Sequence, residues 1–324
     1  MKTDDRAGIA RPARPPAVAG TFYPAGAEAL RTLLDELEAR AATSFPVPAG
    51  LDAGRPAGIL VPHAGLVYSG AVAAAAWRLV ASAGAAGSAA GGSTGGSAAG
   101  SVASGSDALT IVLLGTNHGA AWLDGVGAWD GGPWWTPLGE VQVDEELTGS
   151  ILELGPPFVA DAACHLGEHS LEVQLPFVRR VAVGARIVAL SVGAGTGGRA
   201  IAAGKRLGRL LAERRAAGAP IVLAISSDMA HYPSAEIAEA VTDTLRPSIV
   251  RLDAETLAVA EAEIARRRPG VSCGMCGIEP TVLGLAALRA MGARPGVAVA
   301  AATSADAGGD PRRTVGYLAV AFGA

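Results

Sequence analysis

The chain has 324 residues, of which 50% are apolar and 17% are charged, and its net charge is −4. This balance is typical of a soluble globular protein with a large core, because disordered chains have the opposite mix. The weak negative charge, without a basic stripe interleaved with aromatics, argues against nucleic acid or an anionic membrane as partner. Since the N-terminus lacks the apolar stretch of a secretory signal and no apolar run is long enough to span a membrane, we expect a cytoplasmic protein.

The first third of the chain predicts an arm, three regular elements and an insertion. Residues 1–15 are expected to form a flexible arm, and leucines at helical spacing predict a helix over 27–42. A short buried strand is predicted at 58–61, followed by a helix of small residues over 69–80. The segment 82–107 is almost entirely Ala, Gly and Ser, which bury too little apolar area to offset their ordering entropy. We therefore expect a disordered surface insertion within one domain that covers 16–324.

The rest of the chain alternates apolar runs with segments of helical spacing. Strands are predicted at 109–114, 125–129, 186–192, 221–225, 297–302 and 315–322. Helices are predicted at 144–154, 170–181, 200–216, 235–244, 251–266 and 280–291. Strands that alternate with helices, and that are apolar throughout, predict an α/β fold. The expected architecture is a single domain with a mostly parallel central sheet and helices on both faces.

Three polar clusters directly follow predicted strands, at 62–65, 115–118 and 226–231. They contain His63, His118 and His231. In open α/β sheets, ligands bind outside the carboxyl ends of the strands, so these three histidines are expected to converge. The alternative is that each histidine separately ends its own strand. Three of only five histidines in the same structural position favours a shared site.

A fourth cluster lies at 167–176. Ser170 suits a helix N-cap, and His169 and Glu172 are three residues apart, so they can share a helical face. Glu172 could then orient a histidine of the site by accepting its ring proton. The alternative is a capped helix whose first turn is solvated.

The three cysteines are Cys164, Cys273 and Cys276, too few for a disulfide framework. Cys273 and Cys276 form a CxxC pattern ahead of a predicted helix. A zinc knuckle would need a second pair, and a thioredoxin-type motif would lie nearer the N-terminus. A thiol beside a helix N-terminus has a lowered pKa, which favours the thiolate as a ligand or nucleophile. Two small buried cysteines are the alternative.

Taken together and in order, these segments resemble the MEMO family, known in bacteria as protein B of the AmmeMemoRadiSam system. The resemblance covers nearly the whole chain, and its set of ordered motifs is specific although no single motif is decisive. The matching segments are Ala17-Val18-Ala19-Gly20-Thr21-Phe22-Tyr23-Pro24, Val61-Pro62-His63-Ala64-Gly65, Gly115-Thr116-Asn117-His118, Glu168-His169-Ser170-Leu171-Glu172, Ser226-Ser227-Asp228-Met229-Ala230-His231, Cys276-Gly277-Ile278-Glu279-Pro280 and Val315-Gly316-Tyr317.

The resemblance implies the fold of class III extradiol dioxygenases, which are non-haem iron enzymes that cleave aromatic rings. It also implies a metal pocket made of His63, His118 and Cys276, with Asp228 and His231 beside it and His231 as an acid/base. Cys276 is preferred to Cys273 because the Cys-Gly-x-x-Pro pattern fits it alone. The residues expected around this pocket are His169, Glu172, Asn117 and Cys273. The sequence departs from the family's pattern at two points, the doubled cysteine (Cys273 and Cys276) and the insertion at 82–107. The insertion falls between motifs and should leave the site intact.

Two imidazoles and a thiolate form a softer donor set than two histidines and a carboxylate, and three ligands leave coordination positions open. We expect Fe(II), with copper or zinc as alternatives, and an oxidoreductase or dioxygenase-like reaction on an unknown small molecule or peptide. One alternative is a non-catalytic scaffold, since animal relatives are described as binding phosphotyrosine-containing segments. Another is a zinc hydrolase. The family's bacterial name implies a radical S-adenosylmethionine protein and a small AMMECR-type domain as partners.

Overall fold

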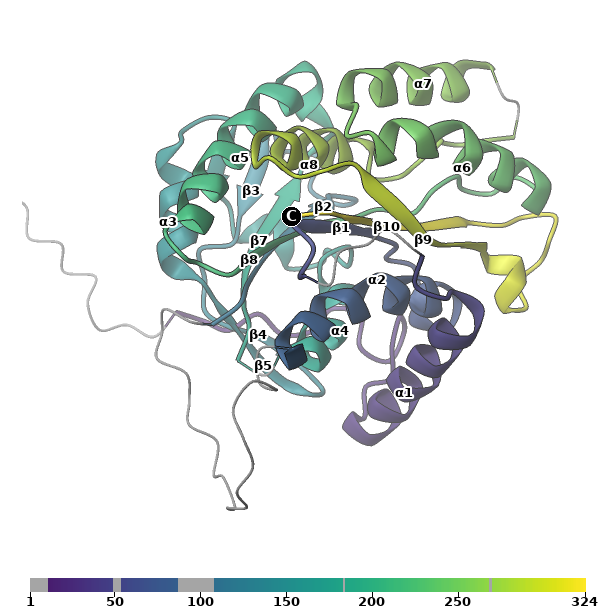
Figure 1. Ribbon diagram of the computed structural model, residues 1–324, viewed down its shortest axis with the longest axis horizontal. Helices are drawn as coiled ribbons and strands as arrows, with labels where there is room; N and C mark the ends of the chain where they lie inside the picture. The colour runs from purple at the N-terminus through teal and green to yellow at the C-terminus, as the bar shows by residue number, and fades with distance from the viewer. Residues whose placement is uncertain (1–10, 49–53, 87–107, 183, 268–269) are drawn as a thin grey trace, which may run out of the picture.

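The computed structural model describes residues 11–48, 54–86, 108–182, 184–267 and 270–324 (Figure 1). Within these ranges ten strands form one sheet in the order β4-β5-β7-β2-β8-β1-β10-β9, and β3 pairs with β7 and β6. The strands are β1 Gly58–Val61, β2 Thr110–Thr116, β3 Val126–Ala128, β4 Trp134–Thr136, β5 Gly139–Val143, β6 Phe158–Ala160, β7 Arg186–Val192, β8 Ile221–Ser226, β9 Gly296–Thr303 and β10 Gly316–Phe322.

The helices of the described ranges lie in two layers, one on each face of the sheet (Figure 1). On one side α5, α6 and α8 contact the strands, α7 packs against α6 and α8, and α3 packs against β6 and β7. On the other side α2 and α4 contact the strands, and α1 packs against α2. The helices are α1 Ala27–Ser44, α2 Leu66–Ala86, α3 Glu145–Glu153, α4 Leu175–Val181, α5 Ala200–Ala216, α6 Ala235–Val250, α7 Ala254–Arg267 and α8 Ile278–Ala290, with short 3-10 turns at Ala163–His165, Glu172–Gln174, Ala194–Arg199 and Ser304–Ala307. None of these helices combines the length and the apolar character needed to cross a membrane.

The centre of the sheet is parallel, as predicted, but its edges are not. Strands β7, β2, β8 and β1 run parallel to one another. Strands β9 and β10, and strands β4 and β5, form antiparallel pairs, and β10 joins β1 antiparallel. A parallel pair needs a long crossover connection, whereas two residues join β4 to β5 and only a 3-10 turn and a loop join β9 to β10. Outside the four central strands, β5 pairs parallel with β7 and β3 pairs parallel with β6. The sheet is therefore mixed, and the prediction of a mostly parallel sheet was only partly right.

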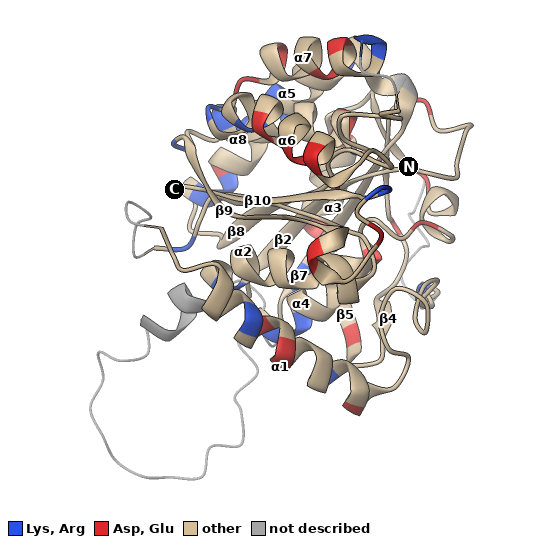
Figure 2. Cartoon of the chain, turned by 90° about the vertical axis from the view of Figure 1, so that its right-hand side faces the viewer, with Lys and Arg blue, Asp and Glu red and all other residues tan. Residues whose placement is uncertain are grey.

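Strand side chains alternate between two apolar cores. In β2, Val112 and Leu114 pack with the α5–α8 layer, while Ile111 and Leu113 pack with the α1–α2 layer, and all four are fully buried. Both faces of the central strands are thus covered, which explains their unbroken apolar sequences. Figure 2 shows the same division: charged residues lie mostly on helices and loops, and β1, β2, β8 and β10 contain none.

The boundaries of most predicted elements agree with the structure to within a few residues, and those of β1, β7 and α5 agree fully. Helix α6 is longer than predicted, because Pro247 lies inside the helix without ending it. Strands β4, β5 and β6 were not predicted. The helix predicted over 170–181 begins as a 3-10 turn at Glu172–Gln174 and becomes α-helical only at Leu175.

Both predicted irregular segments differ from the structure where it describes them. Within the arm predicted over 1–15, Arg14 is fully buried and pairs with Trp134 in a β-bridge, so this residue packs against the domain. Helix α2 extends to Ala86, so the predicted insertion at 82–107 begins inside a helix. Residues 1–10 and 87–107 lie outside the described residues.

Candidate metal centre

The site lies at the carboxyl ends of three neighbouring parallel strands. Strand β8 pairs with both β1 and β2, so the residues that follow these strands meet at one edge of the sheet. His63 follows β1, His118 follows β2, and Asp228 and His231 follow β8. Cys276 comes from the loop before α8, where its backbone N–H donates to the carbonyl oxygen of Asp228 at 3.2 Å. One potential ligand atom from each of His63, His118 and Cys276 lies within 4.8 Å of the other two.

His63 is buried and has a partner on each ring nitrogen. Its Nδ1 lies 3.0 Å from the hydroxyl of Ser226, and its Nε2 lies 3.2 Å from the Sγ of Cys276. Burial and the neighbouring His118 lower the pKa of His63 to about 3. Its imidazole is therefore neutral in the physiological range.

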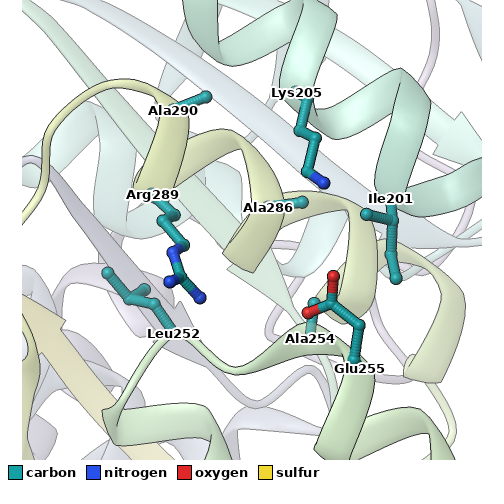
Figure 3. Close-up of a pocket in the computed structure, with 8 residues that line it drawn as sticks. All are labelled: Ile201, Lys205, Leu252, Ala254, Glu255, Ala286, Arg289 and Ala290. Carbon is teal, nitrogen blue, oxygen red and sulfur yellow. The ribbon is translucent and has the colours of Figure 1, made fainter.

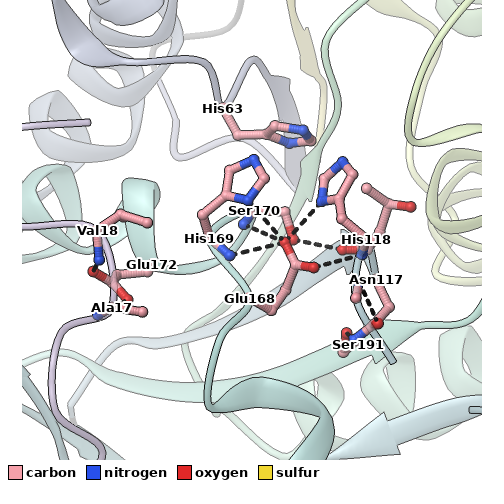
Figure 4. A network of polar contacts seen from close by, with 12 residues as sticks. Ala17, Val18, His63, Asn117, His118, Glu168, His169, Ser170, Glu172 and Ser191 are labelled. Carbon is pink, nitrogen blue, oxygen red and sulfur yellow. Dashed lines mark hydrogen bonds and ion pairs between the residues drawn. The ribbon is translucent and has the colours of Figure 1, made fainter. Parts of the chain in front are cut away.

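His118 is held by Glu168, as Figure 4 shows. The Glu168 carboxylate accepts from Nδ1 of His118 at 2.9 Å and from the backbone N–H of His118 at 2.5 Å. It also accepts from the backbone N–H groups of His169 and Ser170, each at 2.8 Å. Burial alone would raise the pKa of Glu168, but these hydrogen bonds and the charge of His118 outweigh it and lower the pKa to about 2. An ionised carboxylate only accepts, so Nδ1 of His118 carries a proton, and in the neutral form of the ring Nε2 keeps its lone pair.

Asp228 supports the loop that carries His63. One of its carboxylate oxygens accepts from the backbone N–H groups of His63 and Ala64, at 2.7 and 3.2 Å. The other lies 3.8 Å from Nε2 of His231. Burial raises the pKa of Asp228, against the opposing effects of His231 and of the two backbone hydrogen bonds.

His231 presents a buried ring nitrogen that makes no hydrogen bond within the described part of the chain. Its backbone is fixed by a β-bridge to Val315, and the next residue, Tyr232, has a left-handed backbone with φ 69° and donates its N–H to Thr314. Burial lowers the pKa of His231, partly opposed by Asp228. The neutral imidazole is thus favoured, and its Nε2 is free to exchange a proton with a bound molecule.

Cys276 does not have the lowered thiol pKa that its place before a helix predicted. Burial, together with the charge of Asp228, raises the pKa of Cys276 well above 9. Because the pKa of His63 is low and that of Cys276 is high, the two form a neutral pair and not a thiolate–imidazolium pair. A nucleophilic cysteine of the protease type is therefore disfavoured. A bound cation would restore the thiolate, since metal ions deprotonate the thiols that bind them.

The residues around the cluster make contacts that the sequence did not predict. Ser170 does not cap a helix, because its hydroxyl donates to the carbonyl of Thr116. The amide of Asn117 shapes the turn before Ala120 and bonds Ser191, and Cys273 lies beside the site with a pKa that burial raises to about 11. The ring of His169 stacks on His118 with centroids 4.5 Å apart.

The prediction that Glu172 orients a histidine was wrong. Its carboxylate accepts from Arg14 at 2.6 Å and from Tyr23 at 2.7 Å, away from the histidine cluster (Figure 4). The residue that orients a histidine is Glu168. It lies in one of the family motifs, but the sequence did not predict this role for it. Its position directly before a site histidine was the available signal, but Glu172 fitted a helical face with His169 and so looked the better candidate.

Access to the cluster is open on one side. The side chain of His118 is 37% exposed, and Cys276 is partly exposed, whereas His63 is 1% exposed. A separate pocket of about 340 Å³ lies among α5, α7 and α8 and is lined by Lys205, Glu255 and Arg289 with apolar neighbours (Figure 3). That pocket includes none of the site residues.

The fold and the site define an α/β protein with two histidines and a cysteine gathered at the ends of parallel strands, a donor set suited to a transition metal. The family model described as Memo-like protein matches residues 14–321. A MEMO1 family protein of Aquifex aeolicus is 33% identical over 95% of this chain and 98% of its own length. Another, of Methanocaldococcus jannaschii, is 31% identical over 94% of this chain and 96% of its own. The chain belongs to the Memo-like family, as its motifs predicted.

Among solved structures, an uncharacterized protein of Escherichia coli K12 aligns with 66% of this chain and 85% of its own. Its TM-score is 0.41 and its sequence identity is 17%. This likeness is too weak to carry an argument about the site.

Proposed function

We propose that this MEMO-like protein binds a single transition-metal ion through His63, His118 and Cys276 and acts as an oxidoreductase of dioxygenase-like type. The observation that carries the proposal is the arrangement of the three donors. Each histidine has its Nδ1 engaged by another side chain, Ser226 for His63 and Glu168 for His118, which leaves both Nε2 atoms for a ligand. Such partners are typical of histidines that bind metals.

The donor set also fits a metal by its dimensions. Ligand atoms around a four-coordinate ion lie about 3.5 Å apart, given bond lengths of roughly 2.0–2.3 Å. The three donors lie within 4.8 Å of one another, and Nε2 of His63 is 3.2 Å from the Sγ of Cys276. Imidazole and thiolate suit iron, copper and zinc, with Fe(II) the first choice by family resemblance. When bound, such an ion supplies Lewis-acid or redox chemistry at an open position.

The protein's own residues have distinct parts in this proposal. Glu168 holds the imidazole of His118 in the tautomer that offers Nε2, and Asp228 holds the loop that presents His63. His231 moves a proton to or from the substrate at its Nε2. His231 favours an enzyme over a scaffold, because its buried Nε2 lies 3.8 Å from Asp228 but makes no hydrogen bond within the described residues, which leaves it for a ligand.

The test is anaerobic purification with metal quantification, followed by oxygen-uptake measurements against candidate small molecules and peptides. We expect about one iron or copper per chain, retained by Cys164→Ala and lost by Cys276→Ala. Cys164 is the matched control, since it is buried and contacts Asp161 instead of the cluster. Protein that holds neither metal after reconstitution would overturn the proposal.

Two other outcomes would assign the protein a different function. Hydrolysis that depends on zinc and needs no oxygen would make the protein a zinc hydrolase. Peptide binding that survives His63→Ala and His118→Ala would make it a scaffold on this fold. Partnership with a radical S-adenosylmethionine protein and an AMMECR-type domain stays a prediction from the family resemblance.

A further inference from the structure

The hydroxyl of Ser226, at the end of β8, contacts the Nδ1 side of the His63 ring, whereas Cys276 contacts the Nε2 side. Its Oγ lies 3.0 Å from Nδ1 of His63, 2.7 Å from the carbonyl oxygen of Ser170 and 3.1 Å from Nε2 of Gln174. Ser226, Ser170 and Gln174 are fully buried. Since a hydroxyl has one donor and two acceptor sites, these three neighbours fill its capacity.

The amide of Gln174 has only one orientation that satisfies its surroundings. Its oxygen accepts from the indole N–H of Trp77 at 3.0 Å, and its nitrogen donates to the carbonyl of Pro62 at 2.9 Å. An indole nitrogen can only donate and a carbonyl can only accept, so the reverse orientation would face donor with donor and acceptor with acceptor. The amide nitrogen of Gln174 therefore faces Ser226 and donates to it.

The single proton of the Ser226 hydroxyl is then assigned. Ser170 offers only a carbonyl acceptor, and Gln174 offers only an N–H donor, so the hydroxyl donates to Ser170 and accepts from Gln174. Its remaining lone pair faces Nδ1 of His63, which must carry a proton to complete the contact. Turning the hydroxyl proton toward His63 would instead leave the buried carbonyl of Ser170 without this hydrogen bond.

We propose that Ser226 is a positioning residue that fixes His63 as the Nδ1–H tautomer and so aims the Nε2 lone pair at Cys276. The tautomer itself follows from the hydrogen bonds of Ser226, and only its use for metal binding depends on the function proposed above. Nε2 of His63 then faces Cys276 with a free lone pair. The only proton between the two atoms is the one on the Cys276 sulfur. Loss of that one thiol proton is all that the pair needs in order to present two donors.

The first test reads the tautomer directly, by ¹⁵N NMR of the imidazole nitrogens in metal-free protein, with His63→Asn to assign the signals. We expect Nδ1–H in the wild type and a shift toward Nε2–H in Ser226→Ala. Ser69→Ala is the matched control, because Ser69 is also fully buried next to this loop but donates to the backbone of Ala64. Ser226→Thr, which keeps the hydroxyl, should restore the wild-type tautomer. An Nε2–H tautomer in the wild type would overturn the proposal even if Ser226→Ala did not fold, and so would an unchanged tautomer in folded Ser226→Ala.

The second test measures Zn²⁺ affinity by competition with a chelator. Ser226→Ala should bind about 10- to 100-fold more weakly than the wild type, the usual cost of removing a hydrogen-bond partner of a ligating histidine. Ser69→Ala should bind like the wild type. Equal affinity of wild type and Ser226→Ala would contradict the positioning role. A wild type that binds no metal would instead sink the proposed function, while the NMR result would still decide the tautomer.

Discussion

Two glutamates four residues apart, Glu168 and Glu172, are both buried, yet they serve different regions of the molecule. Glu168 holds His118 and three backbone N–H groups at the candidate metal centre. Glu172 holds the side chains of Arg14 and Tyr23. It also accepts from the backbone N–H groups of Ala17 and Val18, which fixes the N-terminal segment to the domain (Figure 4). The comparison shows that the partners decide what a buried carboxylate does: His118 keeps a second ring nitrogen for a ligand, whereas the contacts of Glu172 hold the N-terminal segment in place.

Glu172→Gln should cause the largest loss of stability. It would leave the guanidinium of Arg14 buried without its charge partner, and breaking a buried ion pair from one side costs about 3–5 kcal/mol. Urea unfolding of wild type and variant checks this value. If Glu172→Gln unfolds like the wild type, the ion pair has no structural role and the distinction between the two glutamates fails.

Lowering the pH should remove the contribution of Glu168 to stability within a defined pH range. The pKa of Glu168 falls from an ordinary 4.5 to about 2 on folding, so its contribution to stability is complete above pH 4.5 and is lost as the pH falls toward 2. This shift corresponds to about 3 kcal/mol. Unfolding free energies of wild type and Glu168→Gln, measured between pH 5 and 2.5, should converge as the pH falls. Parallel curves for the two proteins would show that the carboxylate is not stabilised in this way.

Glu168→Gln should also weaken metal binding by about 10- to 100-fold, because His118 loses the carboxylate that sets its tautomer. Glu172→Gln is the matched control and should bind metal like the wild type at a temperature where both are folded. Chelator competition measures both affinities. Equal losses in the two variants would mean that the glutamates act only through the fold.

His169→Phe should have the smallest effect on metal binding. Its ring stacks on His118 and its Nδ1 lies 3.4 Å from Glu168. His169 is therefore close enough to His118 and Glu168 to bind a metal ion with them, but the proposed site does not use it as a ligand. Phenylalanine keeps a stacking ring, and the affinity should fall by less than in Glu168→Gln. A collapse of affinity in His169→Phe would place His169 among the ligands and displace His63 or Cys276.

The parts of this molecule that follow local rules could be predicted from the sequence. Apolar runs identified the central strands, and the histidines and Asp228 after them met as the topology rule requires. Arg14 could not be found this way, because a proline-rich segment looks irregular whether or not it packs. The different roles of Glu168 and Glu172 could not be predicted either, because they depend on His118 and Arg14, which lie far away in the sequence. Cys276 was chosen over Cys273 by family resemblance, since spacing alone left both open.

The most direct test of the central claim is X-ray absorption spectroscopy of the metal-loaded wild-type protein, with Cys276→Ser and Cys164→Ser beside it. The metal centre proposed here predicts one sulfur and two imidazole nitrogens in the first coordination shell of the wild type and of Cys164→Ser. It predicts no sulfur in Cys276→Ser. A wild-type spectrum without sulfur, or one that Cys276→Ser leaves unchanged, would contradict it.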